Sequence, residues 1–338
     1  MRVLWKKLPW LNATMKEILP SELPITTVCD PSISFNGFFL AKSALAFSDG
    51  SGKDVAISGY SFSPSADTAK YKSIYEVYER FFAHYAFAET ALGDQIELNN
   101  FFGEKSGIFA ETKKIAVGTG YMDASGLSFH RSFEEAREHA LHEIIERHFL
   151  ALWWYKNQPL AMIDGESKKL PGMTMEFYTS CHIDIPFVLC VLRNDVGTTW
   201  LCGSSLKRNY HDAVSHAGKE AMMLYEGISG GLQGPEVEIK SHNTQSEDRL
   251  RSLMDVAFVQ ERQKYLEETT TGKPKKRAKK DYSVKEIMMN MKMGIDDIDL
   301  ALFHRSEEGV VLRALNPDLL SLRSMRDSMP TALFDPFC

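Results

Sequence analysis

Two stretches of the chain carry a pair of glutamates followed by an arginine, and these residue types can hold a metal ion or form ion pairs. One stretch reads EVYERFF at residues 76–82, and the other reads EIIERHF at residues 143–149. In both, the glutamates stand three positions apart and bulky apolar residues follow the arginine. The residues of this repeated pattern are Glu76, Glu79, Arg80, Glu143, Glu146 and Arg147.

Both stretches lie in segments with helical spacing of apolar residues, from Ala69 to Ala88 and from Ser132 to Tyr155. Ser132 is expected to cap the second helix, with Glu135 three residues later completing a capping box. An i, i+3 spacing places both carboxylates of a pair on one side of the helix, at the edge of the apolar stripe. Two such helices face to face would gather four negative charges where little water can screen them, which is costly.

Divalent cations would offset this cost, and hard oxygen ligands favour Mg²⁺, which often bridges carboxylates to substrate phosphates. The pattern therefore predicts a nucleotide bound through metal ions, with Arg80 and Arg147 contacting phosphate or orienting carboxylates. The chain has neither a P-loop nor the protein-kinase signature set, so an ATP site would be of another type. Surface ion pairs on exposed helices are the alternative interpretation of the same residues.

A zinc site is a second alternative for HALHEIIERHF, residues 139–149. A zinc-hydrolase helix requires H-E-x-x-H, because histidines at i and i+4 present two nitrogens to one metal. Here His142 and Glu143 start the motif, but its fifth position is Glu146. His139 and Glu143 stand four apart, a spacing that more often belongs to a hydrogen-bonded pair than to a ligand set. The sequence therefore favours magnesium over zinc.

Composition narrows the class of protein. The 338 residues are 44% hydrophobic and 25% charged, which is enough to bury a large core in two or three structural units. A net charge of −6 argues against non-specific binding to nucleic acid or to anionic membranes. The N-terminus lacks a signal-peptide core and no segment predicts a membrane span, so a cytoplasmic location is expected. Five widely spaced cysteines indicate neither disulfides nor a thiolate zinc site.

The order of predicted elements indicates a mixed α/β fold of the α+β type. Strands are expected within 25–41 and 54–62, as a pair within 108–122, and as a second pair within 185–207 joined at 194–197. A third helix is expected from Asp212 to Tyr225. The run GKPKKRAKK predicts a mobile basic surface loop at about 268–281, with docking of an acidic partner as the alternative. The C-terminal stretch is expected to be kept in place by contacts with the rest of the protein.

These motifs resemble the YcaO family. The segment GYSFSPSADTAKYKSIYEVYERF is similar to the family's first signature, and ASGLSFHRSFEEAREHALHEIIERHFLALWW is similar to its second. The weaker third match is DAVSHAGKEAMMLYEG, which contains Glu220. The matching positions of the first two are Ala69, Lys72, Glu76, Glu79, Arg80, Gly126, Glu135, Ala136, Ala140, Leu141, Glu143, Glu146, Arg147, Trp153 and Trp154.

The resemblance implies a YcaO-like fold with ATP bound between helices, and ATP and Mg²⁺ as cofactors. Residues 1–57 would be an N-terminal segment that matches only loosely, and residues 58–338 the catalytic domain. The implied Mg²⁺ ligands are Glu76, Glu79, Glu143, Glu146 and Glu220. The implied ATP-binding residues are Lys72, Arg80, Ser125, Gly126, Arg147 and His216. Ala124 and Ser125 depart from the family's usual Ser-Asn, and His216 replaces a residue that is usually Arg.

The resemblance further implies an ATP-dependent enzyme that phosphorylates backbone amides of a ribosomally made precursor peptide. Cyclodehydration of Cys, Ser or Thr to azolines is the expected reaction, as in thiazole- and oxazole-containing bacteriocins. Thioamide or amidine formation is the alternative within the family. A non-catalytic nucleotide-binding or scaffold subunit is the alternative of another class, because the departures at Ala124, Ser125 and His216 affect the implied nucleotide contacts.

Expected partners are the precursor peptide, a leader-peptide-binding protein of ThiF-like type, a flavin dehydrogenase and a second copy of the chain. A separate leader-binding protein is expected because the N-terminal segment is short for a recognition domain. The terminal residue Cys338 has two interpretations, an ordinary thiol or part of a C-terminal carboxylate region that reaches the active site.

Overall fold

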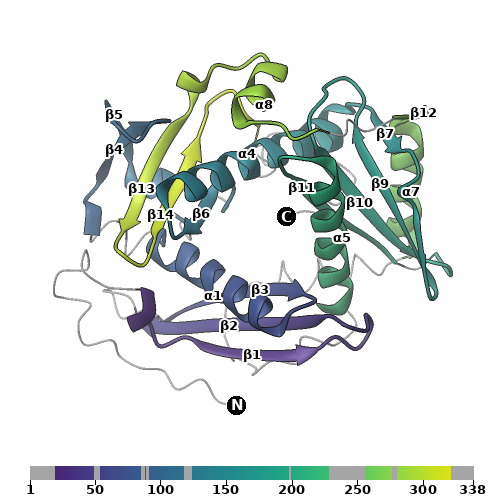
Figure 1. Cartoon of the computed structure of the whole chain (residues 1–338), viewed down its shortest axis with the longest axis horizontal. Coiled ribbons are helices and arrows are strands. Elements are labelled where there is room, and N and C mark those ends of the chain that lie inside the picture. Colours follow the sequence, from purple (N-terminus) through teal and green to yellow (C-terminus); the bar gives the residue numbers. More distant parts are fainter. Residues whose placement is uncertain are drawn as a thin grey trace. The chain divides into compact units, whose positions relative to one another are not determined.

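The fold was analysed in a computed structural model, and Figure 1 shows its helices and strands. The chain divides into two compact units. The first comprises residues 1–144, 230–240 and 295–316, and the second comprises residues 145–229, 241–294 and 317–338. Within these, the structure describes residues 20–48, 54–84, 88, 91–117, 124–197, 199–227, 256–275 and 280–320.

The first unit contains two antiparallel sheets. One has the order β1-β2-β3, with strands Thr26–Pro31, Phe39–Ser48 and Asp54–Ser63. The other has the order β5-β4-β13-β14-β6, with strands Lys105–Glu111, Gln95–Asn100, Asp299–Arg305, Val310–Leu315 and Leu127–His130. Short helical turns complete the unit: η2 (Pro20–Glu22), α3 (Thr112–Ile115) and η4 (Ile295–Asp297).

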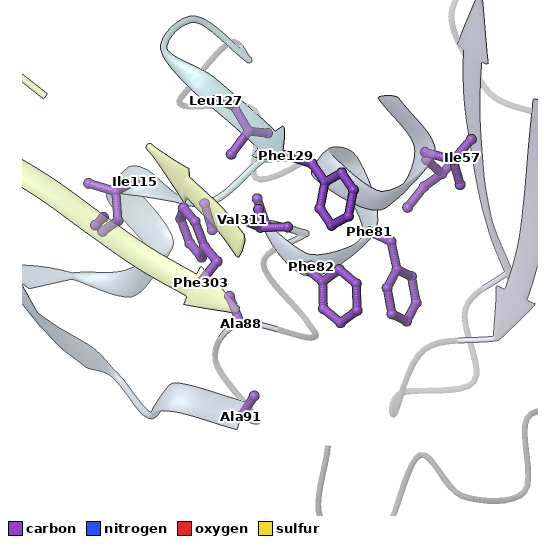
Figure 2. Close-up of a cluster of buried hydrophobic side chains, with 14 of the residues drawn as sticks. Ile57, Phe81, Phe82, Ala88, Ala91, Ile115, Leu127, Phe129, Phe303 and Val311 are labelled. Atoms are coloured by element: carbon purple, nitrogen blue, oxygen red, sulfur yellow. The ribbon is translucent and has the colours of Figure 1, made fainter. Parts of the chain in front are cut away.

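Helix α1 (Ala66–Phe82) packs on strands of both sheets of the first unit, namely β2 and β3 of one and β6 and β14 of the other. Its apolar face enters a buried cluster that Figure 2 shows, in which Phe81, Phe82 and Phe129 lie together with Phe303. The Phe81 and Phe82 rings meet edge to face with centroids 5.3 Å apart. Burial of these large side chains fixes the rotation of α1, and so fixes where its polar residues lie.

The described residues of the second unit form a mixed sheet of order β11-β10-β9-β7-β12, with β8 paired to β9. Helix α5 packs on β10 and β11 of this sheet. Two further helices, α7 and α8, belong to the same unit. The elements are β7 (Leu160–Ile163), β8 (Lys168–Leu170), β9 (Met173–Ser180), β10 (Phe187–Asn194), β11 (Trp200–Leu206), α5 (Tyr210–Glu226), α7 (Val256–Thr269), β12 (Thr270–Lys275) and α8 (Val284–Asn290).

Helix α4 (Phe133–Lys156) starts in the first unit and ends in the second. The predicted cap at its start is confirmed, because Ser132 Oγ accepts a hydrogen bond from the backbone N–H of Glu135 at 3.2 Å. The Ser132 hydroxyl also donates to the Glu135 carboxylate at 3.0 Å. None of the described helices combines the length and the apolar composition that a membrane span requires.

The mixed α+β architecture is confirmed, while three local expectations need correction. Helix α1 ends at Phe82 rather than continuing to Ala88. Where the strand pair within 108–122 is expected, the described residues form the end of β5 and the short helix α3, while residues 118–122 lie outside the described residues. The expected basic loop at 268–281 begins with the last two residues of α7 and with β12 (Thr270–Lys275), and residues 276–279 lie outside the described residues. Thr270 and Thr271 are β-branched, and they pair in parallel with Leu160 and Ala161 of β7.

Candidate metal and nucleotide site

The first predicted carboxylate, Glu76 of α1, is fixed by contacts with the neighbouring strand β3. Its Oε2 atom accepts a hydrogen bond from the backbone N–H of Tyr60 at 2.5 Å, and its Oε1 atom pairs with Arg80 Nη2. Arg80 also donates from Nη1 to the carbonyl of Ser58 at 2.6 Å. One guanidinium therefore joins the strand backbone to the carboxylate. This geometry agrees with the orienting role that the sequence left open for Arg80.

The second carboxylate of α1, Glu79, is partly buried. Burial raises its pKa well above the ordinary value, while the backbone N–H of Phe129, which donates to Oε1 at 2.9 Å, lowers it. The charges of Glu143 and Glu76 raise the pKa of Glu79 further, and Arg80 lowers it. Three carboxylates of the first unit are therefore close enough for their charges to influence one another.

In the second unit, Glu146 of α4 is held by strand β11. Its Oε1 atom accepts from the Ser204 hydroxyl at 2.6 Å, and its Oε2 atom accepts from the backbone N–H of Leu206 at 3.1 Å. Arg147 Nη1 lies 3.7 Å from Glu146 Oε1. The carboxylate side chain is only 13% exposed. As with Glu76 and Glu79, a backbone N–H from a strand fixes a helical carboxylate.

The remaining predicted ligand, Glu220, lies in α5 where this helix crosses β11. A Cβ atom built on Gly203 of β11 would come 2.9 Å from the Cβ of Glu220. Helix and strand therefore approach closely at Glu220.

The predicted ATP-binding residues lie at three places. Lys72 is exposed on α1 one turn before Glu76, and His216 is half-buried on α5 one turn before Glu220. Ser125 and Gly126 form the turn that enters β6, where Gly126 has a φ of +74° and accepts a hydrogen bond from the backbone N–H of Ala314 at 2.8 Å. The tight turn explains the glycine. Cys338 lies outside the described residues.

Within the described part of the chain, no three His, Cys, Asp or Glu side chains are arranged as a ready-made cation site, and this holds for the predicted glutamates as well as for zinc ligands. His142 is buried, and its Nε2 atom lies 4.0 Å from the Glu138 carboxylate, which is an ordinary i, i+4 pair.

The chemistry of the carboxylate set fits magnesium. Glu76, Glu79 and Glu143 supply hard oxygen atoms, and burial together with the two neighbouring carboxylates raises the pKa of Glu79. A hard divalent cation would lower that pKa and offset the repulsion. Glu146 offers a second place for oxygen ligation in its own unit. The donor set is therefore compatible with Mg²⁺ and unsuited to soft metals.

Sequence reasoning missed the groups that hold these carboxylates. They are the backbone N–H groups of Tyr60, Phe129 and Leu206, together with the Ser204 hydroxyl. Backbone donors carry no side-chain signature. The only available signal was a glycine inside a predicted strand, which indicates close approach of another backbone.

The family model of YcaO cyclodehydratases, described as ATP- and Mg²⁺-binding, matches residues 107–287. This match covers more than half of the chain, and the chain belongs to the YcaO family. No curated protein matches the sequence. ATP and Mg²⁺ are the ligands named for the family.

Solved structures share the fold. YcaO from Methanopyrus kandleri, bound with AMPPCP and Mg²⁺, has a TM-score of 0.56 at 11% identity, covering 87% of this chain and 85% of that one. The E. coli microcin synthetase McbBCD complex with pro-MccB17 bound gives 0.60 at 14% identity, covering 94% and 91%. A heterocyclase in complex with substrate and cofactor gives 0.59 at 15% identity, covering 88% of this chain and 50% of that one.

Proposed function

We propose that this protein activates backbone amides of a ribosomally made precursor peptide by ATP-dependent phosphorylation, and that its product is an azoline ring. Residues 58–338 would form the catalytic domain. Membership of a family of ATP- and Mg²⁺-binding cyclodehydratases supports the proposal. The observation that carries it is the grouping of Glu79 with Glu143 and Glu76, whose charges raise the pKa of Glu79 and would be offset by a bound cation.

The carboxylates Glu76, Glu79, Glu143, Glu146 and Glu220 would hold Mg²⁺ bound to the phosphates of ATP. Bound Mg²⁺ would neutralise the charge that develops on the phosphates during transfer. Arg80 keeps Glu76 fixed against β3, and strand N–H groups hold Glu79 and Glu146 in place before any ligand binds. Such preorganisation spares the cost of ordering these side chains during the reaction. Lys72 and Arg147 would contribute positive charge toward the nucleotide, with His216 as a further contact and Ser125 and Gly126 at its turn.

The proposed reaction solves the problem that an amide oxygen is a poor leaving group. A Cys, Ser or Thr side chain of the precursor attacks the carbonyl carbon of the preceding amide and releases its proton. The amide oxygen then takes the γ-phosphoryl group of ATP, and ADP leaves. Loss of the amide proton together with phosphate breaks the C–O bond and forms the C=N bond of the azoline.

The experiment combines the purified protein, its leader-binding partner, ATP, Mg²⁺ and the precursor encoded near this gene. We expect ADP and phosphate to appear together with a peptide that has lost one water per ring. Replacing the cyclising Cys, Ser or Thr by Ala should abolish the loss of water. Formation of a thioamide would instead require added sulfide, and the peptide would gain mass. Formation of an amidine would require an internal amine of the peptide.

The Glu143→Gln and Glu146→Gln variants test the metal assignment, with Glu134→Gln as a control on the exposed side of the same helix. We expect the first two to lose peptide modification and the control to keep it. Nucleotide binding without turnover in the wild-type complex would favour the scaffold function, which the departures at Ala124, Ser125 and His216 motivate. Copurification and light scattering would test the leader-binding protein, the flavin dehydrogenase and the second copy of the chain as partners.

A further inference from the structure

Each unit contains one copy of the same arrangement, a three-stranded antiparallel meander followed by a helix. In the first unit β1, β2 and β3 lead into α1, and in the second β9, β10 and β11 lead into α5. The helices span Ala66–Phe82 and Tyr210–Glu226, so both have 17 residues and are offset by 144 positions. Each helix packs on the last two strands of its own meander.

The offset of 144 positions also relates the local details of the two copies. The N-cap Ser65 corresponds to Asn209, and each side chain accepts a hydrogen bond from the backbone N–H three residues later. The buried helix residues Ala69, Ser73 and Val77 correspond to Ala213, Ala217 and Ala221, which are also buried. On the polar side, Lys72 corresponds to His216 and Glu76 to Glu220.

Each copy has a glycine in its last strand, directly beneath the helix. A Cβ atom added to Gly59 of β3 would lie 2.1 Å from the carbonyl oxygen of Ser73 and 2.9 Å from the Cβ of Glu76. A Cβ atom added to Gly203 of β11 would lie 2.2 Å from the carbonyl oxygen of Ala217 and 2.9 Å from the Cβ of Glu220. These glycines again stand 144 positions apart.

We propose that Gly59 and Gly203 are positioning residues, which bring a metal-binding glutamate of each unit to the distance from its strand that ligation requires. This proposal rests on the proposed function. The atoms that an added Cβ would meet include helix backbone, which cannot rotate away, so helix and strand would have to separate. Glu76 lies against Gly59 in the same way as Glu220 lies against Gly203, so the same steric feature sets the position of both glutamates.

In the first copy, the distance between α1 and β3 at Gly59 bears directly on the contacts of the Glu76 carboxylate. The residue after Gly59 is Tyr60, whose backbone N–H donates to Glu76 Oε2. The residue before it, Ser58, accepts from Arg80, which pairs with Glu76 Oε1. Displacing the helix from β3 at Gly59 would therefore stretch both contacts that hold Glu76. The residue after Gly203 is Ser204, whose hydroxyl binds Glu146, so the same stretch of β11 serves a second carboxylate.

The test measures the Mg²⁺ concentration needed for half-maximal binding of a non-hydrolysable ATP analogue, by titration calorimetry on the full chain. We expect Gly59→Ala and Gly203→Ala each to raise that concentration by about tenfold or more, since displacement of a site by about 1 Å can cost about a hundredfold. Nucleotide affinity in EDTA should stay unchanged, which separates positioning from general loss of structure.

Gly218→Ala is the matched control, because Gly218 lies in α5 two residues from Glu220. Its added Cβ would meet the end of the Met175 side chain at 3.0 Å, which can move aside. We expect this variant to need the same Mg²⁺ concentration as the wild type. Circular dichroism and thermal unfolding in EDTA accompany each measurement.

The outcomes distinguish this proposal from the proposed function. If Glu76→Gln and Glu220→Gln raise the Mg²⁺ requirement while both alanine variants leave it at the wild-type value, the positioning role is wrong and the metal assignment stands. If Glu76→Gln and Glu220→Gln leave it unchanged, the metal assignment itself fails. Should the alanine variants not fold, Glu76→Asp and Glu220→Asp withdraw the carboxylate by one carbon with the glycines intact. An unchanged Mg²⁺ requirement in these variants overturns the proposal.

Discussion

The backbone N–H of Phe129 donates to the carboxylate of Glu79 across 2.9 Å, although the two residues are fifty positions apart in the chain. The bond joins β6 to α1 inside the first unit. The Phe129 ring meanwhile packs edge to face on Tyr75 and Tyr78 of the same helix, with centroids 4.8 and 5.1 Å apart. Apolar packing thus places a backbone N–H donor on a partly buried carboxylate.

The first prediction concerns Glu79→Gln in the absence of Mg²⁺. The amide keeps the shape of the side chain and removes repulsion from Glu143 and Glu76, so we expect the free energy of unfolding to rise by about 1 kcal/mol at pH 8. The same change should weaken Mg²⁺-dependent nucleotide binding, because an oxygen ligand with charge is lost. Urea unfolding in EDTA and calorimetry with Mg²⁺ measure the two effects. A variant that loses both stability and binding would contradict the charge argument.

The second prediction concerns Arg80, which contacts both the Ser58 carbonyl and Glu76. Lysine has a single ammonium group and cannot span both partners, so Arg80→Lys should weaken Mg²⁺-dependent nucleotide binding by about tenfold. The double variant Arg80→Lys/Glu76→Gln should bind nucleotide only slightly more weakly than Glu76→Gln alone, since both changes disrupt the same Arg80–Glu76 pair. Arg137→Lys is the control, because Arg137 contacts the Phe101 carbonyl and ring. Fully additive losses would refute the coupling.

Part of this site could be predicted from the sequence and part could not. Helices α4 and α5 follow from apolar residues at three- and four-residue spacing, and from local caps such as Ser132 and Asn209. The glutamate pairs follow from the same periodicity. These are local properties, readable within a few turns of chain.

The contacts that hold the carboxylates depend on pairing between distant segments. Glu146 meets Ser204 across 58 positions, and Glu79 meets Phe129 across 50, so no local pattern contains both partners. Strand β12 was missed because its lysines and proline resemble a loop, whereas pairing with β7 decides its conformation. Tertiary context overrides propensity at such positions.

The third prediction concerns Thr269, whose Oγ1 atom accepts from Trp153 Nε1 at 3.0 Å and donates to the Tyr265 carbonyl at 2.8 Å. Thr269→Val keeps the volume and leaves the buried indole N–H without its acceptor, so the free energy of unfolding should fall by about 1–3 kcal/mol. Nucleotide affinity should not change, because Trp153 serves packing. Thr270→Val, which removes a hydroxyl that only donates to the Leu266 carbonyl, is the milder control.

The fourth prediction concerns pH and His304. Its ring stacks on Phe82 with centroids 3.9 Å apart, and burial lowers its pKa to about 4. The unfolded chain takes up this proton near pH 6.5, while the folded chain resists it until about pH 4. The free energy of unfolding should therefore fall as the pH drops between these values, by up to about 3 kcal/mol. His304→Phe should show a smaller fall than the wild type in urea unfolding across this range. Parallel curves would exclude His304 as the source.

The fifth prediction separates the two residues of the turn before β6. Gly126 has a φ of +74°, and an added Cβ would lie 2.1 Å from the Cγ2 atom of Ile144 and 2.7 Å from the carbonyl oxygen of Ala314. Gly126→Ala therefore combines backbone strain with a steric clash, and should lower the free energy of unfolding by at least about 2 kcal/mol. Ile144→Ala removes only the side-chain clash, so it should not restore stability in the double variant.

Ser125 in the same turn does not have the positive φ of Gly126, so Ser125→Ala should lower the free energy of unfolding by less than Gly126→Ala does. If the turn contacts ATP as proposed, this variant should still raise the KM for ATP, because a hydroxyl is lost from the nucleotide site. Steady-state kinetics and urea unfolding on the same preparations distinguish the two effects. If Ser125→Ala keeps the wild-type KM for ATP while Gly126→Ala is unstable, the turn serves the fold and does not contact the nucleotide. Backbone strain and the steric clash at Gly126 would then be enough to explain why this position is a glycine.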